Sequence, residues 1–444
     1  MRIRKKNNKY GGTTVFLSIV LSAVILIECT YLTFVWDLDR RMEISRALKC
    51  QVESILADYD RELFKMYGIY AFTLDDTDDY VFKKVLEARG LEEGQSIEVD
   101  GVELLSTEAI RSAISSYYAY RGAGVLFKMT VTQVKDLIEE IDRTGVISRI
   151  REFMSSGASE YLEDMLSGSF ELPEGSEELS EEQLESLQKI SGLIDDSEDD
   201  ITSYNGSLRI NDLGFIIDGF SEMERLINVG SGLMTLGAGH QMIAHYAAYN
   251  FDCVVDNEAD SSITGIKFSE IHSDNMLDSE YIMNGVDGRI GLVTVSSLIF
   301  QILFCKAFLD IYSNPAELYL YQTIALALST ILPIISGGTV EIPTKAMEFI
   351  VIAIACVCKS CSGYSTLLDG GTVSLYDKDE KEFIIMSYRD FLYLYQCCVP
   401  DNMLLSRINE VLTRDFGKLC TGVTLVTKYR ETTYDISKSY SLYC

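Results

Sequence analysis

The sequence has few of the residues that usually carry catalytic chemistry. Only 3 histidines occur in 444 residues. His240 and His245 are five positions apart, so a helix would not place them on one face, as it does the i, i+4 histidines of a zinc site. No G-x-S-x-G nucleophile motif occurs, and no cysteine–histidine pair is evident. We therefore expect the protein not to be an enzyme and to have no catalytic, cofactor-binding or metal-ligating residues.

Metal-binding cysteine spacing and a phosphate-binding glycine loop are also missing. Cys356, Cys358 and Cys361 give C-x-C-x2-C inside an apolar, helix-like run, and no second pair follows at zinc-finger spacing. The glycine-rich residues 229–239 follow no strand directly and match no nucleotide-binding pattern. We expect most of the 11 cysteines to be small buried hydrophobes and a minority to form disulfides.

Basic residues are scarce relative to acidic ones, except at the start of the chain. The formal net charge is -29, and an acidic surface repels phosphate groups, which excludes nucleic acid as a partner. The exception is the first ten residues, which hold Arg2, Arg4, Lys5, Lys6 and Lys9. A basic start, an apolar run and an acidic body are typical of a chain whose N-terminus stays in the cytoplasm and whose body lies outside.

One long apolar run is present, from Val15 to Trp36. As an α-helix it spans about 33 Å, enough for one crossing of a hydrocarbon core that is about 30 Å thick. A cleaved signal peptide has a shorter apolar stretch, and a lipoprotein signal has a small residue where Glu28 precedes Cys29 here. We therefore expect residues 13–36 to remain as a transmembrane helix, with the lipid bilayer contacting residues 15–36.

Glu28 is an unusual residue for the outer half of a membrane span. Its carboxylate costs roughly 3 kcal/mol there, and less when it is protonated or near the headgroups. It either reaches the outer interface beside Trp36 or meets a polar group on the stem of another subunit. Ser18, Ser22 and Cys29 share one helix face and would permit the close approach of a second helix. The candidate assembly residues of the stem are Ser18, Ser22, Glu28 and Cys29.

The helical pattern continues beyond the membrane. Apolar residues recur at helical spacing from Met42 to Leu56, and no proline or glycine occurs from Val15 to Tyr67. The sequence therefore predicts one continuous helix of about 50 residues, half of it in the bilayer and half outside. That is the shape of a pilin stem.

The stem and the residues after it resemble a known family. The run TTVFLSIVLSAVILIE, followed by DRRMEISRALKCQVESILADYDRELFKMYGIYAF, is similar to the start of an uncharacterised family of single-pass extracytoplasmic proteins. That family is associated with Tad (tight adherence) pilus and type II secretion-like loci in Gram-positive bacteria. The stem also resembles that of TadE- and TadG-type pseudopilins, which carry an acidic residue late in the stem. The short family signature matches Tyr59, Asp60, Arg61, Glu62, Leu63, Tyr67 and Gly68.

Further segments along the chain resemble the same family. The resemblance implies a structural subunit anchored by its stem. The chain departs from type IV prepilins, because Leu17 stands where a glutamate would follow a cut at Gly12, so the basic N-terminus is expected to stay attached. The further matches are a helix ending in Tyr and Arg (Ser106–Gly124), an E-Y-I-x-x-G element (Glu280–Gly285) and a C-terminal segment (Leu367–Leu375 with Tyr388–Tyr395).

The body after residue 73 is expected to be mainly α with minor β structure (α+β). Residues 96–104 alternate around Asp100-Gly101 and predict a small hairpin, and residues 421–428 predict a late strand whose edge could pair with another chain. Residues 376–417 predict amphipathic helices. The acidic residues 171–200 predict a solvated linker. Calcium binding is the alternative, although EF-hand spacing is missing.

The most apolar part of the body, residues 292–358, leaves two interpretations open. Residues 292–312, 318–335 and 346–358 form either a buried helical layer or further membrane spans. Gln301, Lys306 and Asp310 favour the buried layer, as does the third segment, whose roughly 13 apolar residues are too few to cross alone. Pro315 is expected at an early helix position, and Gly337-Gly338 as a stop.

The predicted function follows from this organisation. We expect a single-pass cell-membrane protein, with its N-terminus cytoplasmic and its body extracytoplasmic, that serves as a pseudopilin-like structural component of a Tad-type pilus or secretion apparatus. Its partners are the lipid bilayer and other pilus or secretion-system subunits. The alternatives are a membrane-anchored extracytoplasmic enzyme and a polytopic membrane protein.

The predicted parts are a basic cytoplasmic start (1–12), a transmembrane helix (13–36), a helical stalk (37–73), a first helical and hairpin body segment (74–169), an acidic linker (170–206) and a helix-rich C-terminal domain (207–444).

Overall fold

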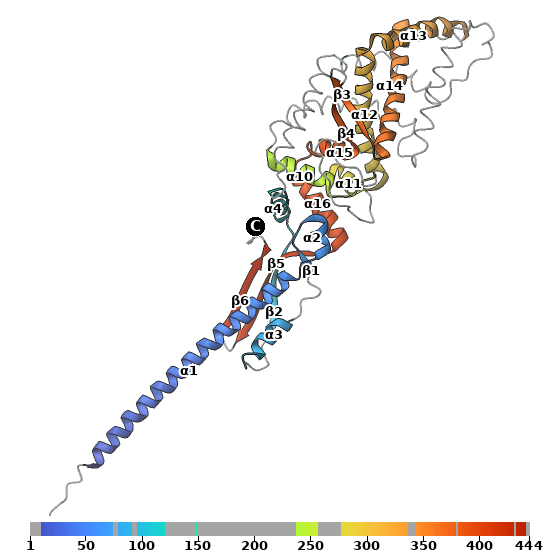
Figure 1. The fold of residues 1–444 in the computed structure, drawn as a ribbon. Coiled ribbons are helices and arrows are strands. Elements are labelled where there is room, and N and C mark those ends of the chain that lie inside the picture. Colours follow the sequence, from blue (N-terminus) through green and yellow to red (C-terminus); the bar gives the residue numbers. More distant parts are fainter. Residues whose placement is uncertain are drawn as a thin grey trace, which may run out of the picture. The chain divides into compact units, whose positions relative to one another are not determined.

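The computed structural model describes residues 10–73, 79–90, 96–119, 148, 237–255, 277–335, 342–378, 381–429 and 432–440. The fold is mainly α-helical with minor antiparallel β structure, as the sequence predicts (Figure 1). The chain forms two compact units. Unit 1 contains Met1–Lys65, Ile69–Ala109 and Phe416–Cys444, and unit 2 contains Met66–Gly68 and Ile110–Asp415.

The described elements divide between these units, with α2, α4 and α16 running across a boundary. In chain order they are α1 (Tyr10–Ala57), α2 (Arg61–Tyr67), β1 (Phe72–Thr73), α3 (Tyr80–Glu87), β2 (Ile97–Leu104), α4 (Thr107–Ala119), α10 (Ala238–Tyr249), α11 (Asp278–Asn284), α12 (Gly288–Ser313), α13 (Pro315–Ile335), α14 (Thr344–Leu368), β3 (Thr372–Lys378), β4 (Lys381–Ser387), α15 (Tyr388–Gln396), α16 (Asp401–Phe416), β5 (Leu419–Tyr429) and β6 (Thr432–Ser439).

The predicted continuous stem helix is confirmed by α1, which has 48 residues. The helix ends at Ala57, after which the Asp58 amide bonds to two carbonyls of the last turn at 3.2 Å each. Asp60 then begins α2, because its Oδ1 accepts hydrogen bonds from the amides of Glu62 and Leu63 at 2.9 Å each. The stalk predicted for residues 37–73 is therefore not one helix, because α1 ends at Ala57 and α2 follows it.

The second half of α1 packs on a four-stranded antiparallel sheet in unit 1. Ile44, Leu48, Val52 and Ile55 recur at helical spacing and are buried against α3 and against β5 residues such as Val423. Each fully buried side chain of this size contributes about 2 kcal/mol of hydrophobic stabilisation. The apolar stripe seen in the sequence is thus the face that holds the stalk to its sheet.

The central strand of this sheet is β5. It pairs antiparallel with β2 on one side, and with β6 and the short β1 on the other. The strand predicted at residues 421–428 is confirmed, but its edges are already paired. The hairpin predicted at residues 96–104 is wrong. β2 is a single strand, and a register shift between Val99 and Gly101 leaves Asp100 as a bulge.

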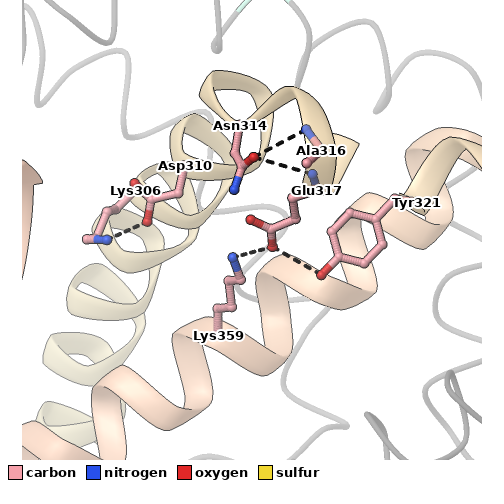
Figure 2. A network of polar contacts seen from close by, with 7 residues as sticks. All are labelled: Lys306, Asp310, Asn314, Ala316, Glu317, Tyr321 and Lys359. Carbon is pink, nitrogen blue, oxygen red and sulfur yellow. Dashed lines mark hydrogen bonds and ion pairs between the residues drawn. The ribbon is translucent and has the colours of Figure 1, made fainter. Parts of the chain in front are cut away.

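Unit 2 contains a layer of three helices, α12, α13 and α14. α14 packs against both α12 and α13, and its residues Ile350–Val357 are all buried. α13 begins at Pro315 as predicted, where the Asn314 side-chain oxygen accepts hydrogen bonds from the amides of Ala316 (3.2 Å) and Glu317 (3.4 Å) (Figure 2). α14 has 25 residues, so the argument that the third segment is too short to cross a membrane is wrong.

β3 and β4 pair antiparallel, so the helices predicted for residues 376–417 are wrong for the part that these two strands occupy. The rest of that prediction is confirmed by α15 and α16. α15 begins with a capping box, in which Ser387 and Asp390 satisfy each other's backbone amides. The acidic linker with its calcium alternative, the glycine-rich residues 229–236 and Gly337-Gly338 lie outside the described residues.

Candidate functional site

The first half of α1 presents a long apolar surface. Its side chains from Val15 to Trp36 are exposed, and none of the most apolar stretch is buried inside the protein. Phe16 and Trp36 expose 66% and 69% of their surface. Contiguous apolar surface of this size is unfavourable in water and favourable in a bilayer. By length and composition α1 can cross a membrane, and so can α12 and α14.

The predicted assembly residues lie on this exposed surface. A regular helix places Ser18, Ser22 and Cys29 on one face and Glu28 about a quarter turn away. The Ser22 hydroxyl donates to the Ser18 carbonyl at 2.8 Å, and the Thr33 hydroxyl donates to the Cys29 carbonyl at 2.7 Å. Each hydroxyl is therefore hydrogen-bonded to a carbonyl of its own helix, so it places no unsatisfied donor in an apolar medium. The Glu28 side chain is exposed, which leaves it accessible to lipid headgroups or to a second chain.

The first of the residues expected to form a signature, Tyr59–Leu63, lie at the corner between α1 and α2. The Tyr59 ring packs edge-on against Phe64 and Tyr70, with centroid separations of 5.5 and 5.1 Å. This aromatic group and the Asp60 cap fix the change of chain direction after the stem. Of the other signature residues in this segment, Leu63 is buried, and Arg61 and Glu62 are exposed.

Tyr67 and Gly68, the rest of the signature, belong to unit 2. Gly68 has a φ of +67°, and a Cβ at this position would lie 2.9 Å from the Tyr117 ring. The Tyr246 hydroxyl donates to the Tyr67 carbonyl at 2.5 Å, and the Tyr67 ring packs 4.9 Å from that of Phe251. Glycine fits here because it tolerates positive φ and lets the Tyr117 ring approach the backbone.

A buried histidine continues this aromatic packing between α4, α10 and α15. The Tyr118 hydroxyl lies 2.9 Å from His245 Nδ1, and the His245 ring stacks on Tyr249 at 4.4 Å and meets Tyr393 edge-on at 5.5 Å. Burial lowers the pKa of His245 to about 3, so its ring is neutral at physiological pH. The neutral ring and the Tyr118 hydroxyl therefore form a hydrogen bond between two uncharged groups.

Glu280 of α11 is a deeply buried carboxyl group, with 1% of its surface exposed. Its Oε1 accepts hydrogen bonds from the Val254 amide and the Tyr388 hydroxyl, both at 3.0 Å. Its Oε2 has no hydrogen-bond partner among the described residues. Burial raises the pKa of Glu280 to about 7, although both donors favour the ionised form.

Side chains of α15 hold the neighbouring helices by their backbones. Arg389 Nη1 donates to the carbonyls of Ala248 (2.7 Å) and Phe251 (2.9 Å) at the end of α10, where the helix dipole favours a cation. Gln396 Nε2 donates to the carbonyl of Ser279 at 3.1 Å and to its hydroxyl at 3.2 Å. α10, α11 and α15 therefore share one buried polar network.

Several segments that resemble the family meet in this network and its aromatic surroundings. Tyr117 comes from the first further match, Glu280 from the second and Tyr388 from the third. The resemblance singled out these segments but did not predict that they meet. Sequence reasoning also missed Arg389, and it rejected His245 as a zinc ligand without predicting its buried aromatic surroundings. The sequence signal that could have found Arg389 is the charged pair Arg389-Asp390, which stands among aromatic residues typical of a protein core.

A second polar group lies where α13 begins, beside α12 and α14 (Figure 2). Lys359 Nζ lies 2.5 Å from Glu317 Oε1, and the Tyr321 hydroxyl donates to the same oxygen at 3.3 Å. On α12, Lys306 pairs with Asp310, which lies one turn later in the same helix. The two cations match the two anions, so this network adds no net charge to an apolar layer.

Among the described residues, no group of three or more His, Cys, Asp or Glu side chains could hold a metal ion. His240 bonds to Asp401 through Nδ1, and its Nε2 lies 2.8 Å from the Cys397 carbonyl. Most described cysteines are buried, as expected, and these are Cys253, Cys305, Cys356, Cys361, Cys397 and Cys420. Comparisons of the chain with protein families, curated proteins and solved structures find no match.

Proposed function

We propose that the protein is a membrane-anchored, pseudopilin-like structural component of a Tad-type pilus or secretion apparatus. The observation that carries the proposal is the form of α1. One continuous helix has an exposed apolar first half and a second half that packs into a folded unit. Because no break separates the two halves, such a helix holds the attached sheet at a fixed orientation to the bilayer.

The distribution of charge supports a single crossing with the N-terminus in the cytoplasm. Basic residues gather in the first ten positions, while the whole chain carries a net charge of -29. In this arrangement α12 and α14 are internal helices of the body. Burial of Ile350–Val357 on α14 and the ion pair of Lys306 with Asp310 on α12 support that placement.

The length of α12 and α14 favours a second candidate, a polytopic membrane protein. Both helices are long and apolar enough to cross a membrane. If they cross together with α1, the connecting helix α13 lies in the cytoplasm. If α1 crosses alone, α13 lies on the outer side with the rest of the body. The location of α13 therefore separates the two candidates.

Thiol labelling measures this location. Cys50 is exposed on α1 beyond the span, and Thr323→Cys places a second thiol on the exposed side of α13. A membrane-impermeant maleimide applied to intact protoplasts, followed by peptide mapping, should label both positions and leave Cys29 in the span unlabelled. Labelling of Cys50 without position 323 would establish three crossings. Labelling of neither position would reverse the orientation.

Copurification tests assembly through the stem. Replacing Ser18 and Ser22 with leucine fills the face that permits close helix approach. We expect recovery of other envelope subunits with this variant to fall about tenfold, equivalent to about 1.4 kcal/mol, at an unchanged membrane level. Leu21→Ile is the matched control, since it keeps an exposed apolar residue of the same volume. Equal recovery with both variants would show that this face does not assemble.

A further inference from the structure

Glu280 has the geometry of a carboxyl group whose neutral form is favoured by burial. It is 1% exposed, one of its oxygens accepts two hydrogen bonds, and the other has no partner among the described residues. A neutral carboxyl group tolerates such a position at modest cost. An ionised one leaves a partly unsolvated charge inside the protein, which is far more costly.

The groups around Glu280 offset only part of the cost of burying its ionised form. Arg389 is close enough to favour ionisation, but its Nη1 is committed to two carbonyls at the end of α10. Burial raises the pKa of Cys253 to about 12, so this neighbour stays a neutral thiol. The titratable and charged groups of the region are Asp252 and Cys253 after α10, Asp278 and Tyr281 on α11, Tyr364 on α14, Tyr388, Arg389 and Asp390 on α15, and Arg407, Glu410 and Arg414 on α16. Arg414 pairs with Asp278.

We propose that Glu280 is a pH-sensitive latch that holds α11 closed when it is protonated and releases α11 when it is ionised. α11 is the element that moves, because it has only 7 residues and carries the carboxyl group itself. Its lifting brings water to both carboxylate oxygens and breaks the bonds from Val254 and Tyr388. The bonds of Gln396 to Ser279 oppose the movement, so the displacement of α11 in the open state is small.

The direction of the effect follows from proton linkage. The folded pKa of Glu280 is about 7, above its ordinary value of 4.5, so the closed state binds the proton more tightly than the open state. The latch is therefore fully held below pH 4.5 and is lost as the pH rises through 7. With these two values, the opening equilibrium of α11 increases about 70-fold between pH 5 and pH 8.

Hydrogen exchange with mass spectrometry tests the latch in the full-length protein in mild detergent. Amides of residues 278–285 should lose about 70-fold in protection between pH 5 and pH 8, after correction for intrinsic exchange. Amides of β5, in unit 1, should keep their protection and serve as the internal reference. A parallel loss in β5 would mean that the protein unfolds as a whole, and that result would overturn the latch.

Three variants sharpen the test. Glu280→Gln keeps the shape of the side chain and removes the titration, so its α11 protection should not change with pH. Glu410→Gln is the matched control, because Glu410 is an exposed carboxylate that accepts a hydrogen bond from Tyr281 of the same helix. Tyr388→Phe removes a donor to the ionised carboxylate and should move the midpoint of opening to higher pH. A pH-dependent α11 in Glu280→Gln, or an unmoved midpoint in Tyr388→Phe, would overturn the proposal.

Discussion

Replacement of Gly285 by alanine should weaken unit 2 more than an ordinary glycine substitution does. Gly285 ends α11 with a φ of +74°, and an added Cβ would lie 2.6 Å from Arg407 Nη2 and 2.8 Å from its Cζ. Arg407 Nη1 donates to the carbonyls of Ile282 (2.9 Å) and Met283 (2.7 Å), so the methyl group displaces a side chain that caps α11.

The magnitude has two parts. Alanine at positive φ costs about 1 kcal/mol. Loss of the two charged hydrogen bonds of Arg407 adds about 2 kcal/mol, since water replaces part of each bond at this half-buried position. We expect Gly285→Ala to lower the free energy of unfolding by about 3 kcal/mol. Gly370→Ala, with a φ of +79° and its nearest contact at 3.9 Å, should cost only the first part, about 1 kcal/mol.

Urea unfolding of the full-length protein in mild detergent, followed by near-ultraviolet circular dichroism, measures both variants. A double-mutant cycle with Arg407→Ala isolates the steric term, because the alanine methyl group then meets no guanidinium. In that background Gly285→Ala should cost no more than Gly370→Ala. Equal costs for Gly285→Ala with and without Arg407 would refute the reasoning.

Three further predictions concern the stalk and the buried histidine. Leu48→Ala should destabilise unit 1 by about 3 kcal/mol by opening a cavity under α1, whereas Met42→Ala, at a 46% exposed position, should cost less than about 0.5 kcal/mol, both measured by urea unfolding. Glu53→Gln should leave stability almost unchanged, and 1 M salt should have a similarly small effect, because the bond of Glu53 to Lys438 lies at the surface. A larger loss would mean that this pair is shielded from water. His245, with a pKa of about 3 against an ordinary 6.5, stabilises the folded state fully above pH 6.5 and loses that contribution as the pH falls toward 3. His245→Asn should therefore flatten the acid side of the pH–stability curve. An unchanged slope would contradict the lowered pKa of His245.

Local patterns predicted those parts of the fold that depend on neighbouring residues. The absence of helix breakers after Val15 and the apolar stripe from Met42 to Leu56 were enough to predict α1 and, except for the exposed Met42, the face that it buries. Residues 96–104 could not be assigned correctly in the same way. An Asp-Gly pair fits a turn or a bulge, and pairing with β5, far away in the sequence, decides between them. The ends of α14 were hidden because Lys359 and several small polar residues interrupt its apolar run.

The candidate site shows the same limit. Resemblance identified the segments that contain Gly68, Glu280 and Tyr388, yet neither spacing nor periodicity indicated that α4, α11 and α15 pack around α10. Glu280 reads as a surface residue in the sequence, since one acidic side chain among 67 carries no signal of its own. Its burial arises from the packing of α11 against α15 and the end of α10, which only the folded chain reveals.

The sheet under the stalk has a consequence for how the protein matures. The Tyr440 hydroxyl bonds to the Leu56 carbonyl, a partner 384 residues earlier in the chain, and β5 and β6 follow the whole of unit 2 in the sequence. Closing a loop of that size is slow compared with forming local helices. During synthesis, Ile44 and Leu48 of the stalk therefore remain without their β5 neighbours until the strands beyond unit 2 have been made. That interval is when a holding factor at the membrane surface would protect the nascent chain from aggregation.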